Sequence, residues 1–129
     1  MPVHSETFVV EWADTDAGGR IHHTAALRWA EVLEQRYYRG AGITDVVANL
    51  PRRRLEVTFH RPLRYTDTVT MQLAVERVGT TSVGYTWRGY RGDGELAVDG
   101  RTVAVSVDDG GRAVPLPDHL RGLLEAGTG

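Results

Sequence analysis

The sequence predicts an α+β domain, with one long central helix wrapped by a curled antiparallel sheet of about five strands in the order βαββββ. Residues 24–39 carry the long helical periodicity of the chain, and they follow a strand-like segment. Four further segments with strand-like alternation come after them, joined by connections short enough to force antiparallel neighbours. The 129 residues suit one domain, placed over residues 1–129, because two cores of normal size need a longer chain.

The first strand is predicted over residues 7–13, where Phe8, Val10 and Trp12 share one face. A loop then interrupts it with two acids and a glycine pair. Gly18 and Gly19 can adopt backbone angles closed to other residues, and they let a ligand approach the main chain. Because this loop leads straight into the predicted helix, acids, amides and histidines fall within one short segment.

The predicted helix has Thr24 or His23 at or near its N-cap. Its apolar positions recur at the spacing of one helix face: Ala26, Trp29, Ala30, Leu33 and Tyr37. Glu31 and Glu34 are placed on a solvated or dimer-contacting face. The Gly-Ala-Gly at residues 40–42 ends the helix. At ~1.5 Å per residue it is long enough to cross a whole sheet.

The remaining strands are predicted over residues 55–59, 69–75, 83–87 and 96–107. Asp99-Gly100 interrupts the alternation of the last segment, and we favour a bulge in one long strand over a hairpin turn because both flanking pieces are short. A linker at residues 115–117 and a short helix over residues 118–125 complete the chain. A bare sheet edge invites pairing with a second copy, so we expect a homodimer.

Composition excludes several kinds of protein. The formal net charge of −2 argues against a nucleic-acid partner. The absence of cysteine rules out disulfides, thiolate metal sites and a cysteine nucleophile. The chain shows no signal-peptide pattern and no apolar run of membrane-spanning length, so we expect a cytoplasmic protein without a membrane span. We expect no metal at His22 and His23, because neighbouring side chains diverge and the spacing places no third ligand.

Residues 11–25 resemble the motif of a known family. The run Asp14-Thr15-Asp16-Ala17-Gly18-Gly19, with His23 seven residues after Asp16, is similar to that of the hotdog-fold acyl-CoA thioesterases. The match is best with the 4-hydroxybenzoyl-CoA thioesterase family, in its branch of short bacterial enzymes linked to the Tol-Pal system. A looser match is Phe59-His60-Arg61-Pro62-Leu63, followed by Asp67. The resemblance spans nearly the whole chain, and it implies the hotdog fold, thioesterase activity, and a homodimer that pairs further into a tetramer.

The resemblance also implies roles for individual residues. Asp16 corresponds to the catalytic carboxylate of the family, and His23 to an active-site histidine of one branch. Trp12 stands where that branch has a tyrosine, and His22 where a tyrosine is common, so both are expected to line the substrate pocket. In hotdog dimers an acid from the partner's helix can reach the site, which makes Glu31 a further candidate.

Thioester hydrolysis needs a polarised carbonyl, an oxygen nucleophile and room for a thiolate to leave. A thiol with a pKa near ~8.5 leaves as an anion without much acid assistance, so no strong proton donor or metal is obligatory. We expect no cofactor beyond the CoA of the substrate. The helix start at Thr24, with Gly18 and Gly19, would supply amides to the developing oxyanion. Asp16 either attacks the carbonyl directly or deprotonates a water, while His23 orients the reactants or shuttles a proton.

The phosphates of CoA call for arginines. The candidates are Arg61, Arg64, Arg88 and Arg91, together with the run at residues 52–54. An acyl-carrier protein remains an alternative to CoA as the group that bears the acyl chain.

Two other functions share this fold. Acyl-thioester hydratases and dehydratases commonly carry Asp-x-Asn-Pro-x-His, with the histidine five residues after the acid. Here no Asn-Pro follows Asp16, and the histidines lie six and seven residues on, which argues against that activity. A non-catalytic acyl-binding module is the third interpretation, with Trp12 in place of tyrosine marking a lost activity.

Overall fold

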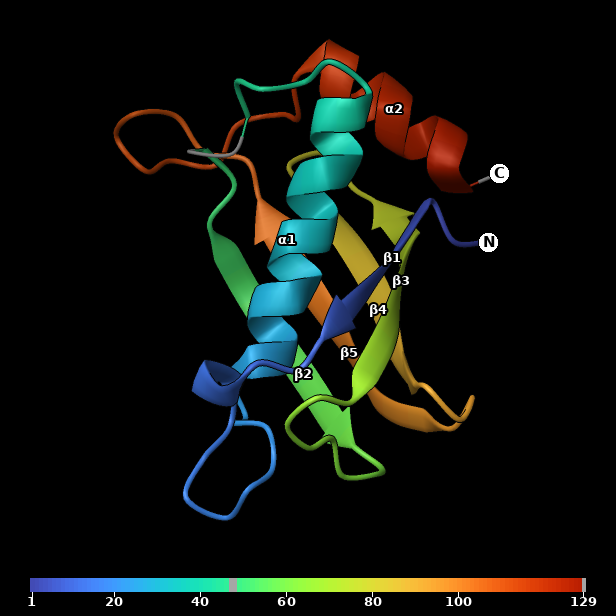
Figure 1. Cartoon of the computed structure of the whole chain (residues 1–129). Coiled ribbons are helices and arrows are strands. Elements are labelled where there is room, and N and C mark those ends of the chain that lie inside the picture. Colours follow the sequence, from blue (N-terminus) through green and yellow to red (C-terminus); the bar gives the residue numbers. More distant parts are fainter. Residues whose placement is uncertain (47–48, 129) are drawn as a thin grey trace.

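The computed structural model describes residues 1–46 and 49–128. Its elements are β1 (His4–Val9), the 3₁₀ turn η1 (Trp12–Asp14), α1 (Ala25–Gly40), β2 (Arg52–Phe59), β3 (Thr68–Val78), β4 (Ser82–Arg91), β5 (Leu96–Val105) and α2 (Asp118–Thr128). The strands form one antiparallel sheet in the order β1-β3-β4-β5-β2 (Figure 1). The predicted α+β class, strand number and element order are confirmed.

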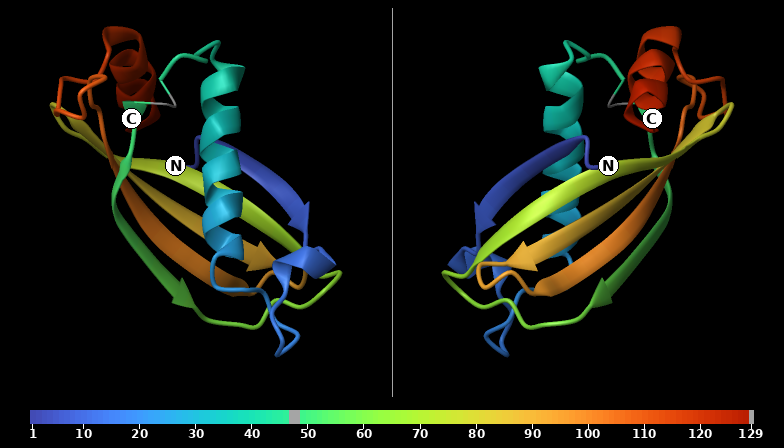
Figure 2. Two further views of the ribbon diagram at one scale, coloured as in Figure 1. Left: turned by 90° about the vertical axis from the view of Figure 1, so that its left-hand side faces the viewer. Right: turned by 90° about the vertical axis from the view of Figure 1, so that its right-hand side faces the viewer.

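The helix α1 lies across the concave face of the curled sheet (Figure 1). The C-terminal helix α2 packs at the same side, where the Tyr37 hydroxyl donates a hydrogen bond to the carbonyl of Leu123 at 3.3 Å. Neither helix covers the outer face of the sheet (Figure 2). Within the described part of the chain, no helix combines the length and apolarity needed to cross a bilayer.

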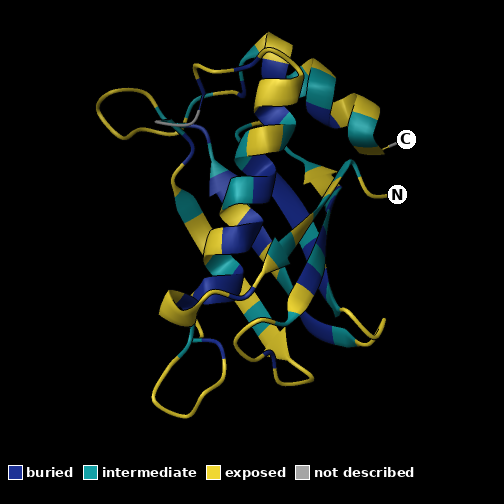
Figure 3. Ribbon diagram, in the orientation of Figure 1, coloured by how far each residue is buried: buried dark blue, intermediate teal, exposed yellow. Residues whose placement is uncertain are grey.

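The core lies between α1 and the sheet, where the sheet-facing side of the helix is buried (Figure 3). Trp29, Ala30 and Leu33 come from the predicted apolar stripe and meet the strands there. Fully burying a leucine such as Leu33 contributes about 1.5–3 kcal/mol. Tyr38 is buried and Tyr37 is only partly buried. At the end of the helix the buried face therefore includes Tyr38 rather than the predicted Tyr37.

The first strand ends at Val9, so the prediction that it continues to residue 13 is wrong. The chain leaves the ladder at Val10, whose amide and carbonyl bond to the loop before β3 instead. Beyond it, the Asp14 carboxylate accepts the amide of Glu11 at 2.9 Å and closes η1. Trp12 therefore stands out from the surface with 76% of its area exposed.

The last strand runs straight through Asp99-Gly100, as one strand but without the predicted bulge. Asp99 pairs with Arg88 and Gly100 with Trp87 in regular register. The glycine is present because Trp87 packs over it: a Cβ at residue 100 would lie 2.2 Å from Cζ2 of that ring. Register shifts occur elsewhere: Arg53 is the extra residue in β2, Glu76 in β3, and Ala97 in β5, two residues before the predicted place.

Glu34 is buried, so its placement on a solvated or dimer-contacting face is wrong. Its carboxylate forms a forked ion pair with Arg52, at 3.0 Å and 2.6 Å, and accepts the Tyr38 hydroxyl at 3.0 Å. Burial raises the pKa of both the Glu34 carboxyl and the Tyr38 hydroxyl. Because Arg52 is the first residue of β2, this pair fastens an edge strand to the central helix.

We expect Gly100→Ala to destabilise the protein by about 2 kcal/mol, because the new methyl group overlaps the Trp87 ring and must displace it. Denaturant unfolding measures the effect. Gly122→Ala is the control, since nothing lies within 4 Å of its Cβ and an alanine in the exposed α2 should stabilise by about 0.5–1 kcal/mol. Equal effects of the two changes would contradict this account of Gly100.

Thr66 has a φ of 74°, an unfavourable angle for a β-branched residue. We expect Thr66→Asn to stabilise the fold by about 1 kcal/mol, because asparagine tolerates this conformation and adds less backbone freedom to the unfolded chain than glycine would. The midpoint of urea unfolding reports the change. Thr80→Asn, at an exposed turn residue without positive φ, should leave the midpoint unchanged. If Thr66→Asn is no more stable than the wild type, the backbone of Thr66 does not carry the strain that we infer from its φ angle.

Candidate active site

The loop between η1 and α1 is a small closed hairpin. Thr15 and Ile21 form its bridge, the Asp16 amide donates to the Arg20 carbonyl at 2.8 Å, and the Gly19 amide donates to the Asp16 carbonyl at 3.1 Å. Gly19 has a φ of 78°, the left-handed conformation that the glycine pair was expected to permit. These hydrogen bonds fix the backbone of Asp16 as the first residue of the turn.

Asp14 anchors this loop to the start of α1. Its carboxylate accepts Arg28 from the first turns of the helix at 2.9 Å, in addition to the Glu11 amide. Its carbonyl accepts the amide of His22 at 2.6 Å. The side chain is buried, and a buried carboxylate is stable only when it is paired and hydrogen-bonded in this way.

Asp16 is exposed, and one of its oxygens is held in place. Oδ1 accepts the Gly18 amide at 2.8 Å, and a Cβ on residue 18 would lie 3.2 Å from that oxygen. Gly18 therefore orients the carboxylate through Oδ1 and leaves Oδ2 for another partner. The amides of Gly18 and Gly19 are thereby both engaged within the loop.

A pocket of about 350 Å³ opens beside the carboxylate. One wall comes from the loop and the other from the segment after β2; the lining residues are Asp16, Arg20, Ile21, His23, Phe59, His60, Arg61, Pro62 and Leu63. The structure thus brings Asp16 and His23 together at one pocket. The Ile21 amide donates to the Leu63 carbonyl at 2.9 Å, which fastens the two walls to each other.

His22 organises the helix start. Its Nδ1 lies 2.8 Å from the Thr24 hydroxyl and accepts the Thr24 amide at 3.2 Å, while its carbonyl accepts the Ala25 amide at 2.9 Å. Thr24 occupies the N-cap position, but its side chain makes no capping bond to the helix. Helix geometry leaves the amides of Ala26 and Leu27 without an intrahelical acceptor. His22 and His23 stack with ring centroids 4.1 Å apart.

The predicted phosphate-binding arginines separate into different surroundings. Arg61 lines the pocket, and Arg64 lies next to it through a bridge with Arg20. Arg88 lies instead on the outer face of the sheet, in a hollow of about 480 Å³ with charged residues such as Arg101, which pairs with Glu56 and Glu76.

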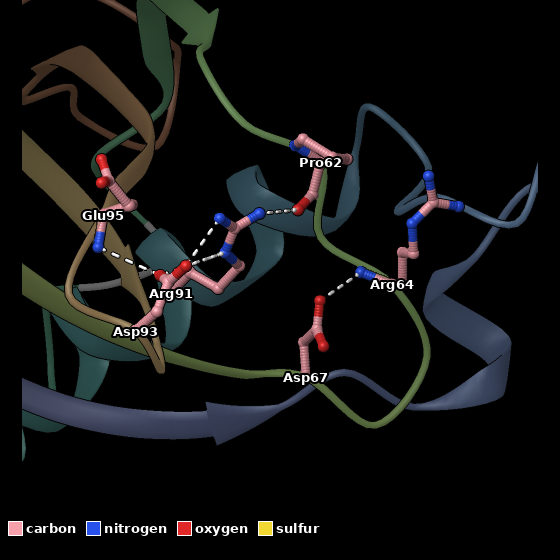
Figure 4. Close-up of polar contacts among 6 residues, drawn as sticks. All are labelled: Pro62, Arg64, Asp67, Arg91, Asp93 and Glu95. Carbon is pink, nitrogen blue, oxygen red and sulfur yellow. Dashed lines mark hydrogen bonds and ion pairs between the residues drawn. The ribbon is translucent and has the colours of Figure 1, made fainter.

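Arg91 is engaged within the protein (Figure 4). Its guanidinium donates to Asp93 at 2.7–3.1 Å and to the Pro62 carbonyl at 3.1 Å, which braces the second wall of the pocket. The hydrogen bond from Arg91 holds the pKa of the Asp93 carboxyl below its ordinary value. The Asp67 carboxylate closes the same segment by accepting the Arg64 amide at 2.9 Å (Figure 4).

Three residues predicted for the substrate pocket, Trp12, His22 and Glu31, do not line this pocket of the single chain. Trp12 projects into solvent from η1, and Glu31 lines a smaller hollow of about 170 Å³ between α1 and the start of β2. Sequence reasoning missed Arg20 and gave no role to His60. The only signal for His60 was its place in the looser motif at residues 59–63. Among the described residues, no three His, Asp or Glu side chains gather into a metal-binding group.

Comparison with known proteins gives a family match over most of the chain. Residues 10–124 match the model of the thioesterase-like superfamily. A thioesterase from Thermus thermophilus, solved with coenzyme A and Zn, is 25% identical, with a TM-score of 0.87 over 98% of this chain and 95% of that chain. The 1,4-dihydroxy-2-naphthoyl-CoA thioesterase from Synechocystis is 15% identical, with a TM-score of 0.87 over 94% of each chain. A search of the curated proteins finds no match. The chain belongs to the thioesterase-like superfamily and has its hotdog fold.

Proposed function

We propose that this protein hydrolyses the thioester of an acyl- or aryl-CoA, or of an acyl-carrier protein, at the pocket beside Asp16. The observation that carries the proposal is the convergence of Asp16, His23 and two arginines on one pocket at the start of α1. Membership of the superfamily supports hydrolysis of a thioester, and the CoA bound to the Thermus relative supports CoA as the carrier.

In this proposal Asp16 supplies the oxygen chemistry. Its Oδ1 is held by the Gly18 amide, so Oδ2 either attacks the acyl carbon or takes a proton from an attacking water. His23 orients the water or the thioester from the same pocket. The positive end of the α1 dipole, with the amides of its first turn, stabilises charge on the carbonyl oxygen. Gly18, Gly19 and Thr24 act by shaping the loop and the helix start, since their amides are bonded within it.

The phosphates of the substrate are assigned to the arginines at the pocket. Arg61 and Arg20 line it, and Arg64 is adjacent. Guanidinium groups bind phosphate through paired charge-assisted hydrogen bonds. Arg91 braces the wall rather than contacting the ligand, because Asp93 and Pro62 already occupy its donors.

We further propose that the protein works as a homodimer joined along β2. This edge strand bonds to β5 on one side only, and its Leu55 and Phe59 are each 48% exposed. An uncovered strand edge with apolar side chains pairs readily with a second copy. The outer face of the sheet, which neither α1 nor α2 covers, is the surface on which two such dimers would form a tetramer.

Asp16→Asn should lower kcat by at least about a hundredfold while the protein stays folded, because the amide is neither nucleophile nor base. Thiol release from a panel of short aliphatic, long aliphatic and benzoyl CoA thioesters measures the loss. Asp108→Asn is a matched control: Asp108 accepts the Gly110 amide at 2.9 Å in a turn of the same kind, away from the pocket. Near-normal turnover by Asp16→Asn would refute the assignment, and wild-type binding without turnover would favour the non-catalytic module.

Leu55→Asp should convert the dimer to monomers, because it buries a charge where two β2 edges meet. Sedimentation velocity on the wild type and the variant measures the change in mass. Val9→Asp alters an equally exposed apolar residue on the opposite edge strand, at 55% exposure, and should leave the dimer intact. A monomeric wild type, or a dimer that survives Leu55→Asp but not Val9→Asp, would contradict the proposed interface.

A further inference from the structure

His60 lies at a fixed point on the second wall of the pocket. It directly follows the last residue of β2, and its amide donates to the Ala97 carbonyl at 2.7 Å. The next amide, of Arg61, donates to the same carbonyl at 3.1 Å. The main chain is therefore tied to β5 on both sides of the His60 side chain, which lines the pocket together with Asp16 and His23.

The imidazole of His60 is oriented by a carboxylate from β5. Nε2 lies 3.1 Å from Oδ1 of Asp99. The backbone of Asp99 is held from both sides, because it pairs with Thr58 on one neighbouring strand and with Arg88 on the other. A carboxylate on one ring nitrogen fixes the ring plane and favours a tautomer with a proton on that nitrogen. The other nitrogen, Nδ1, is then the one available to a ligand.

We propose that His60 is a further catalytic residue, which protonates the departing sulfur of the substrate, with Asp99 as its positioning residue. This inference rests on the proposed thioesterase function. When the ring is protonated each nitrogen carries a hydrogen, so Nε2–H can donate to Asp99 and Nδ1–H remains for a ligand in the pocket that His60 lines. Neither residue was assigned a role by the sequence motif, which centres on the opposite wall.

The step balances as an ordinary hydrolysis. The attacking oxygen, from Asp16 or from a water that Asp16 deprotonates, forms a bond to the acyl carbon. The carbon–sulfur bond breaks, its electron pair passes to sulfur, and the Nδ1 proton of His60 passes to the same sulfur. Where Asp16 itself attacks, a water then hydrolyses the mixed anhydride and frees the Asp16 carboxylate. By either route the products are a carboxylic acid and a thiol, and the proton released from water restores the imidazolium through solvent. Nucleophile and proton donor thus come from opposite walls of one pocket.

The dependence of the rate on the leaving thiol tests this role. The best acyl group of the CoA panel is presented as thioesters of N-acetylcysteamine, an alkyl thiol, and of 4-nitrothiophenol, a more acidic aryl thiol. His60→Gln should lower kcat about a hundredfold for the alkyl thioester and far less for the aryl thioester, whose thiolate leaves without a proton. Asp99→Asn should show the same selectivity with a smaller loss of about tenfold.

A matched pair controls for the loss of a surface histidine. His119 and Asp45 also lie 3.1 Å apart, but on α2 and the loop after α1, so His119→Gln should leave both rates unchanged. Circular dichroism checks that each variant is folded. An equal loss with both thiols, or no loss with either, would overturn the role of His60. That outcome is distinct from failure of the proposed function, which would appear as no thioester cleavage by the wild type or as full activity in Asp16→Asn.

Discussion

The burial of one carboxylate governs the arrangement of the whole site. Asp14 is enclosed at the junction of η1 and α1, and an enclosed charge persists only with partners. It takes Arg28 from the helix, the amide of Glu11 from the chain before it, and, through its carbonyl, the amide of His22 from the chain after it. Three segments are fixed relative to one another by this single residue. Asp16 follows Asp14 by two residues, and His23 directly follows the bonded His22, so both reach the same pocket.

Much of the architecture could be predicted because it follows from periodicity. The 3.6-residue pattern of α1 and the alternation of the later strands each report which face is buried, and burial is the dominant local demand on those residues. Where a contact between distant residues determines the local structure, prediction from periodicity failed. Trp12 continues the alternation of β1, yet the Asp14 cap turns the chain out of the sheet before it. Gly100 was interpreted as an interruption of a strand. It instead leaves the space into which the Trp87 ring packs.

The candidate site divides in the same way. Asp16 and His23 could be found because both belong to one contiguous motif. Arg20 and His60 could not be assigned, because their place at the pocket depends on how the loop meets the segment after β2. Glu34 was misplaced for a related reason: its helical position is compatible with a polar face, and only Arg52, eighteen residues on, allows it to be buried.

The turn that carries Asp16 occurs a second time in the chain. Asp16-Ala17-Gly18-Gly19-Arg20 and Asp108-Asp109-Gly110-Gly111-Arg112 close with equivalent backbone and side-chain bonds, and Gly19 and Gly111 have φ values of 78° and 82°. Such a hairpin cap is therefore an ordinary solution to reversing the chain, one that any exposed connection can adopt. The first copy differs from the second in its position, because it lies beside the start of α1 and a pocket. A short pattern search would retrieve both copies, so annotation of relatives by this pentapeptide alone would mistake a structural closure for a reactive centre.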